Sequence, residues 1–260
     1  KTLVASFSED GAVIKSVKFP TPRNSVEYID LLSTTIRSIS DHETIDAIVI
    51  GLPGVVKDGV ALWCAHLGWE NFDVKNTFSA LFLGIPILVE NDANLGGLGE
   101  TRMLETIPDS SLYVTISTGI GTGVITRGHI DPGLRKSEGG HSLVEFDGIV
   151  REWESFAAGS AIYKAYGKYG KDIHNKRTWK QIADRISRGF LALIPMIQPD
   201  VVIIGGSMGT HFAKYEDQLI GLLKEKLPTH IPCPLFVNAS HPEEAVVYGC
   251  YYYALDTLTV

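Results

Sequence analysis

Apolar residues recur along the chain with two spacings, and the spacing predicts the element. Residues 25–40 follow a helical period that places five apolar side chains on one face, namely Val26, Ile29, Leu32, Ile36 and Ile39. Short apolar runs bounded by polar or glycine positions predict buried strands. Strands are predicted over 3–7, 12–19, 47–51, 85–90, 111–117, 124–126, 201–204 and 234–237, and helices over 25–40, 93–104, 154–169, 178–197, 212–227 and 243–255.

The predicted strands and helices alternate, which indicates an α/β fold. We expect two lobes with a cleft between them, divided at Pro108-Asp109-Ser110. The N-terminal lobe would hold residues 1–108 together with the closing helix within 243–260, and the C-terminal lobe would hold residues 109–242. Loops that meet at strand ends in such a cleft are the default place for a ligand.

Composition narrows the class of protein. The chain of 260 residues is long enough to bury a core without disulfides or a metal, and its apolar fraction of 45% is ordinary for a globular protein. The net charge of −7 disfavours nonspecific binding to nucleic acid or to an anionic membrane. Cys64, Cys233 and Cys250 are scattered without a Cys-x-x-Cys pair. This usage indicates a reducing compartment, so we expect a cytoplasmic protein.

A first polar motif, Glu90-Asn91-Asp92-Ala93-Asn94, lies where a predicted strand meets a predicted helix. Asp92 can be a helix N-cap, a role worth about 1 kcal/mol. It can also be a catalytic carboxylate, and its placement alone leaves the two roles evenly weighted. Asn91 adds a donor and an acceptor beside it, as a polyhydroxy ligand requires.

Two glycine-rich segments follow predicted strands. In residues 117–123 three glycines alternate, so that backbone N–H groups can approach phosphate oxygens while hydroxyls add donors. The alternative is a tight hairpin with glycines at positive φ, and the segment lacks the Gly-Lys-Ser/Thr of a Walker loop. Gly205-Gly206 ends a buried strand, either to let a ligand lie against the backbone or to begin a helix. A further motif, residues 138–141, is by itself more typical of a surface turn than of a binding turn.

Taken together and in order, these motifs resemble the ROK family of sugar kinases and regulators. The matching segments are GLPGVV (51–56), HLGW (66–69), ENDAN (90–94), STGIGTG (117–123), EGGH (138–141), ESFAAG (154–159) and PDVVIIGG (199–206). The resemblance implies a two-lobed, actin-like (RNase H-like) ATPase fold that closes over ATP and a sugar, with nucleotide binding in the C-terminal lobe. It also implies a homodimer.

The resemblance assigns roles to residues. Asp92 would be the general base for a primary hydroxyl, at carbon 6 of a hexose or N-acylhexosamine. The sugar hydroxyls would be held by Gly54, Asn91, Glu138, His141 and Glu154. The ATP phosphates, bridged by Mg²⁺, would be held by Thr118, Gly119, Gly121, Thr122 and Gly123, and the nucleoside would lie near Gly205 and Gly206.

The chain departs from the family pattern in three places. ROK kinases carry a Cys-x-Cys-Gly-x-x-Gly-Cys-x-Glu segment for structural zinc, whereas residues 145–154 contain no cysteine. Because His141 alone cannot make a tetrahedral zinc site, we expect no zinc. We expect Phe146, Ile149 and Trp153 to pack in its place.

The second departure is at the start of the chain. The family's Asp-x-Gly-Gly-Thr phosphate loop would fall just before Lys1, so we expect it in residues upstream. The third is at His66, which stands where relatives often have Asn and which would alter the choice of sugar.

Two other functions stay open at this point. One is the sugar-sensing domain of a ROK transcription regulator, which would carry a helix-turn-helix domain upstream of Lys1. The acidic chain shows no DNA-binding segment of its own. The other is a polyphosphate-dependent glucokinase, which shares the pattern without cysteines.

Overall fold

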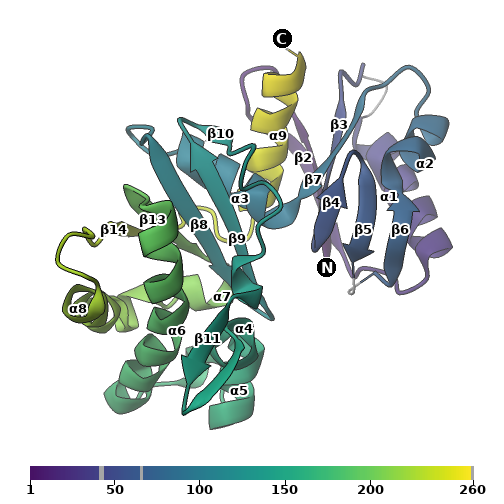
Figure 1. Cartoon of the computed structure of the whole chain (residues 1–260). Helices are drawn as coiled ribbons and strands as arrows, with labels where there is room; N and C mark the ends of the chain where they lie inside the picture. Colours follow the sequence, from purple (N-terminus) through teal and green to yellow (C-terminus); the bar gives the residue numbers. More distant parts are fainter. Residues whose placement is uncertain (41–43, 65–66, 259–260) are drawn as a thin grey trace. The chain divides into compact units, whose positions relative to one another are not determined.

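The computed structural model describes residues 1–40, 44–64 and 67–258, and the fold is α/β as expected (Figure 1). Contacts divide the chain into two compact units. Unit 1 comprises Lys1–Leu95 and Val246–Val260, and unit 2 comprises Gly96–Ala245. The expected boundary lay after residue 108, whereas the division lies between Leu95 and Gly96. A Cβ at Gly96 would lie 2.9 Å from the ring of Tyr113, and a Cβ at Gly97 would lie 3.0 Å from the Tyr113 Cβ. Both glycines therefore pack against a residue of unit 2.

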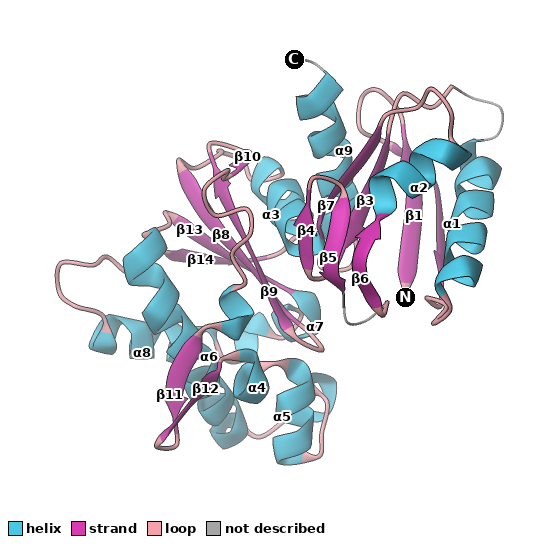
Figure 2. Ribbon diagram, turned by 45° about the vertical axis from the view of Figure 1, so that its right-hand side comes forward, coloured by secondary structure: helices cyan, strands magenta, loops and turns pink. Residues whose placement is uncertain are grey.

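The described residues of unit 1 form three small sheets flanked by helices. Its strands are β1 (Thr2–Phe7), β2 (Val13–Phe19), β3 (Ile48–Leu52), β4 (Val55–Lys57), β5 (Val60–Cys64), β6 (Trp69–Asp73) and β7 (Ile87–Asn91), and its helices are α1 (Ser25–Ser40), α2 (Val74–Leu81), the start of α3 (Asp92–Arg102) and most of α9 (Ala245–Leu258). β1 and β2 are antiparallel, β3 and β7 are parallel, and β4, β5 and β6 form an antiparallel sheet. Figure 2 shows α1 and α2 beside these strands.

The core of unit 1 joins α1, β3, β7 and α2. Leu32 and Ile36 of α1 pack with Ile50 of β3 and Phe78 of α2. The expected apolar face of α1 was wrong at Val26, which is 74% exposed. Val26 lies in the first turn, where its N–H is bound by the side chain of the capping Asn24, and Tyr28 occupies the buried position instead.

Unit 2 holds a five-stranded mixed sheet in the order β10-β9-β8-β13-β14, and a separate hairpin. Its strands are β8 (Ser110–Ile116), β9 (Ile120–Thr126), β10 (His129–Ile130), β11 (Leu143–Phe146), β12 (Ile149–Glu152), β13 (Val201–Gly205) and β14 (Leu235–Asn238). Its helices are α4 (Glu154–Ala157), α5 (Gly159–Tyr166), α6 (Lys176–Ile197), α7 (Gly206–Gly209) and α8 (Glu216–Lys226), with 3-10 turns at Gly139–His141, Gly170–Asp172 and Phe212–Lys214.

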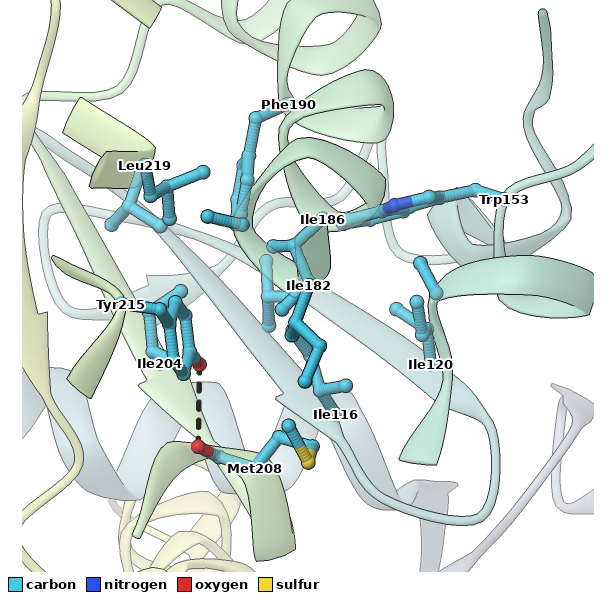
Figure 3. Packing of buried hydrophobic residues seen from close by; sticks show 14 of the residues in the cluster. Ile116, Ile120, Trp153, Ile182, Ile186, Phe190, Ile204, Met208, Tyr215 and Leu219 are labelled. Carbon is cyan, nitrogen blue, oxygen red and sulfur yellow. Dashed lines mark hydrogen bonds between the residues drawn. The ribbon is translucent and has the colours of Figure 1, made fainter. Parts of the chain in front are cut away.

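Alternation along the sheet of unit 2 directs side chains to two faces. Ile116 and Ile204 join Ile186 of α6 and Leu219 of α8 in one large cluster (Figure 3). In the same cluster the buried Tyr215 hydroxyl donates to the Met208 carbonyl oxygen at 3.2 Å, and burial raises the Tyr215 pKa well above its usual range. In an α/β fold, the apolar face of the sheet must be covered by helices, and here α6 and α8 cover it.

Short hairpins account for most of the elements that the sequence pattern missed. Asp58-Gly59 joins β4 to β5, and Asp147-Gly148 joins β11 to β12. Both residues of each pair have positive φ, at 52° and 86° in the first pair and at 54° and 76° in the second. This is the backbone of a two-residue type I′ turn, for which Asp-Gly is a strong signal.

The predicted helix over 154–169 is interrupted at Ala158, which is extended. The reason lies in the next residue: the Gly159 N–H donates to the Ser117 carbonyl oxygen at 2.7 Å, and a Cβ at Gly159 would lie 2.6 Å from the same oxygen. The chain therefore breaks where it touches the end of β8. Among the described helices, none combines the length and the apolar composition needed to cross a bilayer.

Candidate active site

In unit 1 the β7–α3 junction places the Glu90-Asn91-Asp92 motif. The Asn91 Oδ1 accepts hydrogen bonds from the backbone N–H groups of Ala93 (2.8 Å) and Asn94 (3.0 Å). Asn91 therefore caps α3, since its side chain satisfies N–H groups that have no partner within the helix. The capping role that the sequence left open for Asp92 belongs to its neighbour.

The buried carboxylate of Glu90 accepts hydrogen bonds from both sides of this junction. Glu90 is 2% exposed, and its Oε1 accepts from the Asn91 N–H and from the Asn94 Nδ2, both at 2.9 Å. Hydrogen bonding of this kind is what makes a buried carboxylate tolerable. It fixes the turn on which Asn91 and Asp92 stand.

The loop after β3 is tied to the same point. The Asn91 Nδ2 donates to the Gly54 carbonyl oxygen at 2.9 Å. Gly54 has φ +93°, and a Cβ there would lie 2.3 Å from the Trp63 carbonyl oxygen, so only glycine fits. The structure thus brings Gly54 and Asn91, which the resemblance assigned to the sugar hydroxyls, next to Asp92, which it assigned as the general base.

Asp92 is the first residue of α3 and is partly exposed. Unpaired N–H groups at a helix N-terminus stabilise a negative charge. A carboxylate in this position can accept a proton or a hydrogen bond from a hydroxyl group. The chemistry required of a general base is therefore available at this end of β7.

In unit 2 the glycine-rich segment is a hairpin rather than a long loop. β9 begins at Ile120, where the sequence predicted a strand only from residue 124, and Gly121 and Gly123 pair with Thr115 and Tyr113 of β8. None of the three alternating glycines has positive φ. The hairpin alternative is therefore correct for the pairing of the two strands and wrong for the backbone of the glycines. Thr118, which is exposed, and Gly119, which is partly exposed, form the tip.

The tip of this hairpin contacts Glu154, at the start of α4. The Glu154 Oε2 accepts from the Ile120 N–H at 3.0 Å, and a Cβ at Gly119 would lie 2.7 Å from the same oxygen. Glycine at 119 therefore leaves room for the carboxylate. Two motifs that are far apart in the sequence meet here.

The segment 138–141 also packs against β9. Gly139 and Gly140 are buried, and the Gly139 N–H donates to the Thr122 Oγ1 at 2.9 Å. A Cβ at Gly140 would lie 2.0 Å from the Ile120 carbonyl oxygen. The two glycines are thus packing positions in the interior, where the sequence alone favoured a surface turn. Glu138, which is partly exposed, begins the turn.

His141 lies between two carboxylates. Its Nδ1 is 3.4 Å from the Glu152 Oε2 and 4.0 Å from the Glu154 Oε1, and the three side chains are 28 to 49% exposed. The sequence reasoning missed Glu152. Its position became informative only once the hairpin of β11 and β12 was known, because the register pairs it with Leu143, two residues beyond His141.

One imidazole and two carboxylates could hold a metal ion, since one ligand atom of each lies within 4.8 Å of the others. Structural zinc sites use four ligands that are mainly cysteine and histidine. This group supplies one nitrogen and no thiolate. It therefore fits a structural zinc poorly, and both carboxylates are equally suited to binding hydroxyl groups.

The segment without cysteines is partly filled by aromatic rings. Phe146 is 6% exposed and stacks on Phe156 with 4.5 Å between ring centroids. Trp153 is fully buried against Gly189 and Phe190 of α6. The expectation for Ile149 was wrong: it is 58% exposed, because it follows the turn of the hairpin.

Gly205 and Gly206 stand at the β13–α7 junction. A Cβ at Gly205 would lie 2.4 Å from the Tyr113 Oη, and one at Gly206, which has φ +75°, would lie 2.6 Å from the Ile116 carbonyl oxygen. Both glycines thus permit close packing on β8. His66, for which we expected an effect on sugar choice, lies outside the described residues.

Comparisons with known proteins identify the same family as these motifs. The model of the ROK family matches residues 1–257. A fructokinase of Pediococcus pentosaceus is 29% identical over 256 residues, covering 89% of this chain and 83% of the fructokinase. A xylose repressor of Bacillus subtilis (strain 168) is 32% identical over 128 residues, covering 45% of this chain and 33% of the repressor.

Among solved structures, the chain is similar to a ROK family glucokinase from Streptomyces griseus in complex with glucose and AMPPNP. The TM-score is 0.82 at 22% sequence identity, and the match covers 97% of this chain and 95% of the glucokinase. At this identity the likeness concerns the fold.

Proposed function

The chain belongs to the ROK family and is a sugar kinase, and we propose that it transfers the γ-phosphoryl group of ATP to the 6-hydroxyl of a hexose or N-acylhexosamine. Its fold is the two-domain, actin-like ATPase fold of that family. The observation that carries the proposal is the β7–α3 junction, where Asn91 caps the helix. Helix capping therefore does not account for the carboxylate at Asp92.

Asp92 acts as the general base. The sugar hydroxyl gives its proton to the Asp92 carboxylate as its oxygen bonds to the γ-phosphorus, and ADP leaves with the electrons of the broken P–O bond. Phosphoryl transfer depends on positioning and charge stabilisation more than on covalent work by the protein. The rigid seat formed by Glu90 and Asn91 supplies the positioning of this carboxylate.

Each unit offers donors and acceptors that suit sugar hydroxyls. In unit 1 these are the Asn91 amide and the backbone at Gly54, which are already joined by a hydrogen bond. In unit 2 they are Glu138, His141 and Glu154, and we add Glu152 because it lies beside His141. A ligand rich in hydroxyl groups suits such a mixture of carboxylates, amide and imidazole.

The residues present fit a phosphate ligand at the hairpin tip. Thr118 is exposed and offers a hydroxyl and a backbone N–H, and the partly exposed Gly119 has no side chain to block approach. Thr122 and Gly123 are buried, so they support the tip, with Thr122 anchoring Gly139. ATP with Mg²⁺ would supply the phosphoryl group and the charge neutralisation there. Gly205 and Gly206 would border the nucleoside.

Two further statements belong to the proposal. The family pattern makes a homodimer the expected assembly. The acidic balance of −7 is in keeping with a cytoplasmic enzyme that has a small-molecule sugar as its substrate, with neither nucleic acid nor membrane as partner.

The test is a coupled kinase assay over a panel of hexoses and N-acylhexosamines, with ATP or inorganic polyphosphate as donor. Asp92→Asn should lower kcat by at least about a hundredfold, because the base is lost, while sugar binding measured by calorimetry largely survives. Asp73→Asn is a matched control. Asp73 caps α2 through the Asn76 N–H, and asparagine caps equally well, so this variant should keep full activity.

Full activity of Asp92→Asn would remove Asp92 from the mechanism. Sugar binding without turnover from either donor would favour the regulator function, for which the partial match to a xylose repressor is the supporting observation. Turnover with polyphosphate alone would replace ATP as the donor.

A further inference from the structure

Positive charge is concentrated in one stretch of unit 2. Residues 164–188 carry eight Lys or Arg and two Asp, a net charge of +6, while the whole chain has a net charge of −7. The rest of the chain therefore carries −13. The stretch runs from the end of α5 to just past the middle of α6. Such local reversal of charge in an acidic protein attracts anions to one place on the surface.

This stretch also lines two adjoining hollows that share Tyr166. The larger has a volume of about 430 Å³ and is lined by Arg177, Lys180 and Arg185 among others. The smaller has a volume of about 250 Å³ and includes Lys168. Together they form a groove, called here the α6 groove, of the size that small-molecule ligands occupy.

The cations of the α6 groove are available to a ligand. Among the described residues, no carboxylate forms an ion pair with Arg177, Lys180 or Lys168, and all three side chains are exposed. Asp184 also lines the groove, but its carboxylate is bound by Arg188 at 3.0 Å. The remaining acidic lining residue is Asp147, at the turn between β11 and β12.

One cation of the groove is already held in place. The Arg185 Nη1 donates to the Phe156 carbonyl oxygen at 3.0 Å, and its guanidinium lies 4.8 Å from the Phe146 ring centroid and 5.5 Å from that of Tyr166. A guanidinium fixed by rings and a carbonyl loses little freedom when it binds an anion. Arg185 is therefore the anchor of the groove.

The spacing of the cations indicates the ligand. Arg177, Lys180 and Arg185 all line the larger hollow, and eight residues of α6 separate the first of them from the last. Eight residues of helix span about 12 Å. A single phosphate cannot reach all three cations, whereas a short chain of phosphates can.

We propose that the α6 groove binds an anionic ligand with two or more adjoining phosphate groups. It is separate from the residues assigned to the sugar and to the ATP phosphates, and it shares none of them. A long nucleic acid is disfavoured because the surface around this stretch belongs to a chain that is otherwise strongly acidic. The proposal does not depend on kinase activity.

The experiment is isothermal calorimetry on the full chain with inorganic tripolyphosphate in low salt. The wild type should bind it, more tightly than pyrophosphate, and binding should weaken as salt rises. Arg177→Gln with Lys180→Gln should raise the Kd about tenfold or more, because two charge-assisted contacts are lost. Lys224→Gln with Lys226→Gln is the matched control. Both lysines are exposed at the end of α8, and the Kd should stay within about twofold.

Equal affinity in the wild type and the groove variant, or no binding by the wild type, would overturn the proposal. A single-stranded oligonucleotide that binds more tightly than tripolyphosphate, through the same two residues, would overturn the ligand class. Comparison of pyrophosphate with ADP distinguishes the sources, counting only the binding that the variant with Arg177→Gln and Lys180→Gln loses, so that ADP at the proposed ATP site is left out. Equal affinity in this part assigns the phosphate chain alone, and tighter ADP binding in this part assigns a nucleotide. Thermal unfolding confirms that the exposed substitutions leave the fold intact.

Discussion

Replacing Asn91 separates the two hydrogen-bonding jobs of its side chain. The oxygen caps α3 at Ala93 and Asn94, and the amide nitrogen holds the Gly54 carbonyl. Asn91→Ala removes both contacts. Asn91→Ser keeps an oxygen that can cap the helix, but it has no donor long enough to reach Gly54.

The magnitudes follow from the contacts that are lost. A helix cap contributes about 1 kcal/mol, and a hydrogen bond between an amide and a carbonyl contributes about 1 kcal/mol. Asn91→Ala should therefore lower the free energy of unfolding of unit 1 by about 2 kcal/mol. Asn91→Ser should lower it by about 1 kcal/mol, all of it from the released loop at Gly54.

Hydrogen exchange gives a local measurement of the same effect. The Ala93 and Asn94 amides are the ones that the cap protects, so their exchange should accelerate in Asn91→Ala beyond what the global loss explains. In Asn91→Ser the two amides should keep their protection relative to the rest of unit 1. If alanine and serine accelerate these two amides equally, the cap assignment is wrong. If Asn91→Ala leaves the free energy of unfolding unchanged, the accounting of both contacts is wrong.

Three other outcomes are expected. Gly189→Ala should lower the unfolding temperature by several degrees, because the new methyl would lie 2.0 Å from the Trp153 ring; Gly221→Ala in α8, where nothing lies within 4 Å, should instead stabilise by up to about 1 kcal/mol. Burial, and then the neighbouring Lys214, lowers the pKa of His211, so the free energy of unfolding should fall as pH drops below about 6.5, the ordinary histidine value. In His211→Asn the urea midpoint should depend less on pH in that range, and an unchanged dependence would contradict this reason. Metal analysis of purified protein should find no stoichiometric zinc, and a chelator should leave the unfolding temperature unchanged; zinc retained through His141 would show that the group of one imidazole and two carboxylates suffices.

The sequence predicted the long helices α1 and α6 to within two residues at each end, because their periodicity is a property of many residues at once. The bounds of α1 agree at both ends, and β13 and β14 differ from their predictions by one residue at each differing end. Short hairpins were missed because three or four residues show too little alternation. The Asp58-Gly59 and Asp147-Gly148 pairs were the signals that could have found them.

The candidate site divides in the same way. The order of motifs pointed to Asn91 and Asp92, but the direction of a side-chain hydrogen bond cannot be deduced from letters, so the cap could not be assigned. The contact between Ile120 and Glu154 joins residues 34 positions apart, and it depends on where the β8–β9 hairpin ends. Glu152 was missed for a similar reason, since a strand register brings it beside His141.

The division of the chain also dictates an order of assembly during synthesis. Unit 2 is one uninterrupted stretch, whereas unit 1 needs the residues of α9, which are made after all of unit 2. Within unit 1, α9 packs closely on the start of α3: a Cβ at Gly249 of α9 would lie 1.8 Å from the Leu95 carbonyl oxygen of α3. Domains generally fold as units while the chain emerges. Unit 2 can therefore close its core on the ribosome, while the surface of unit 1 that receives Gly249 stays uncovered until α9 is released.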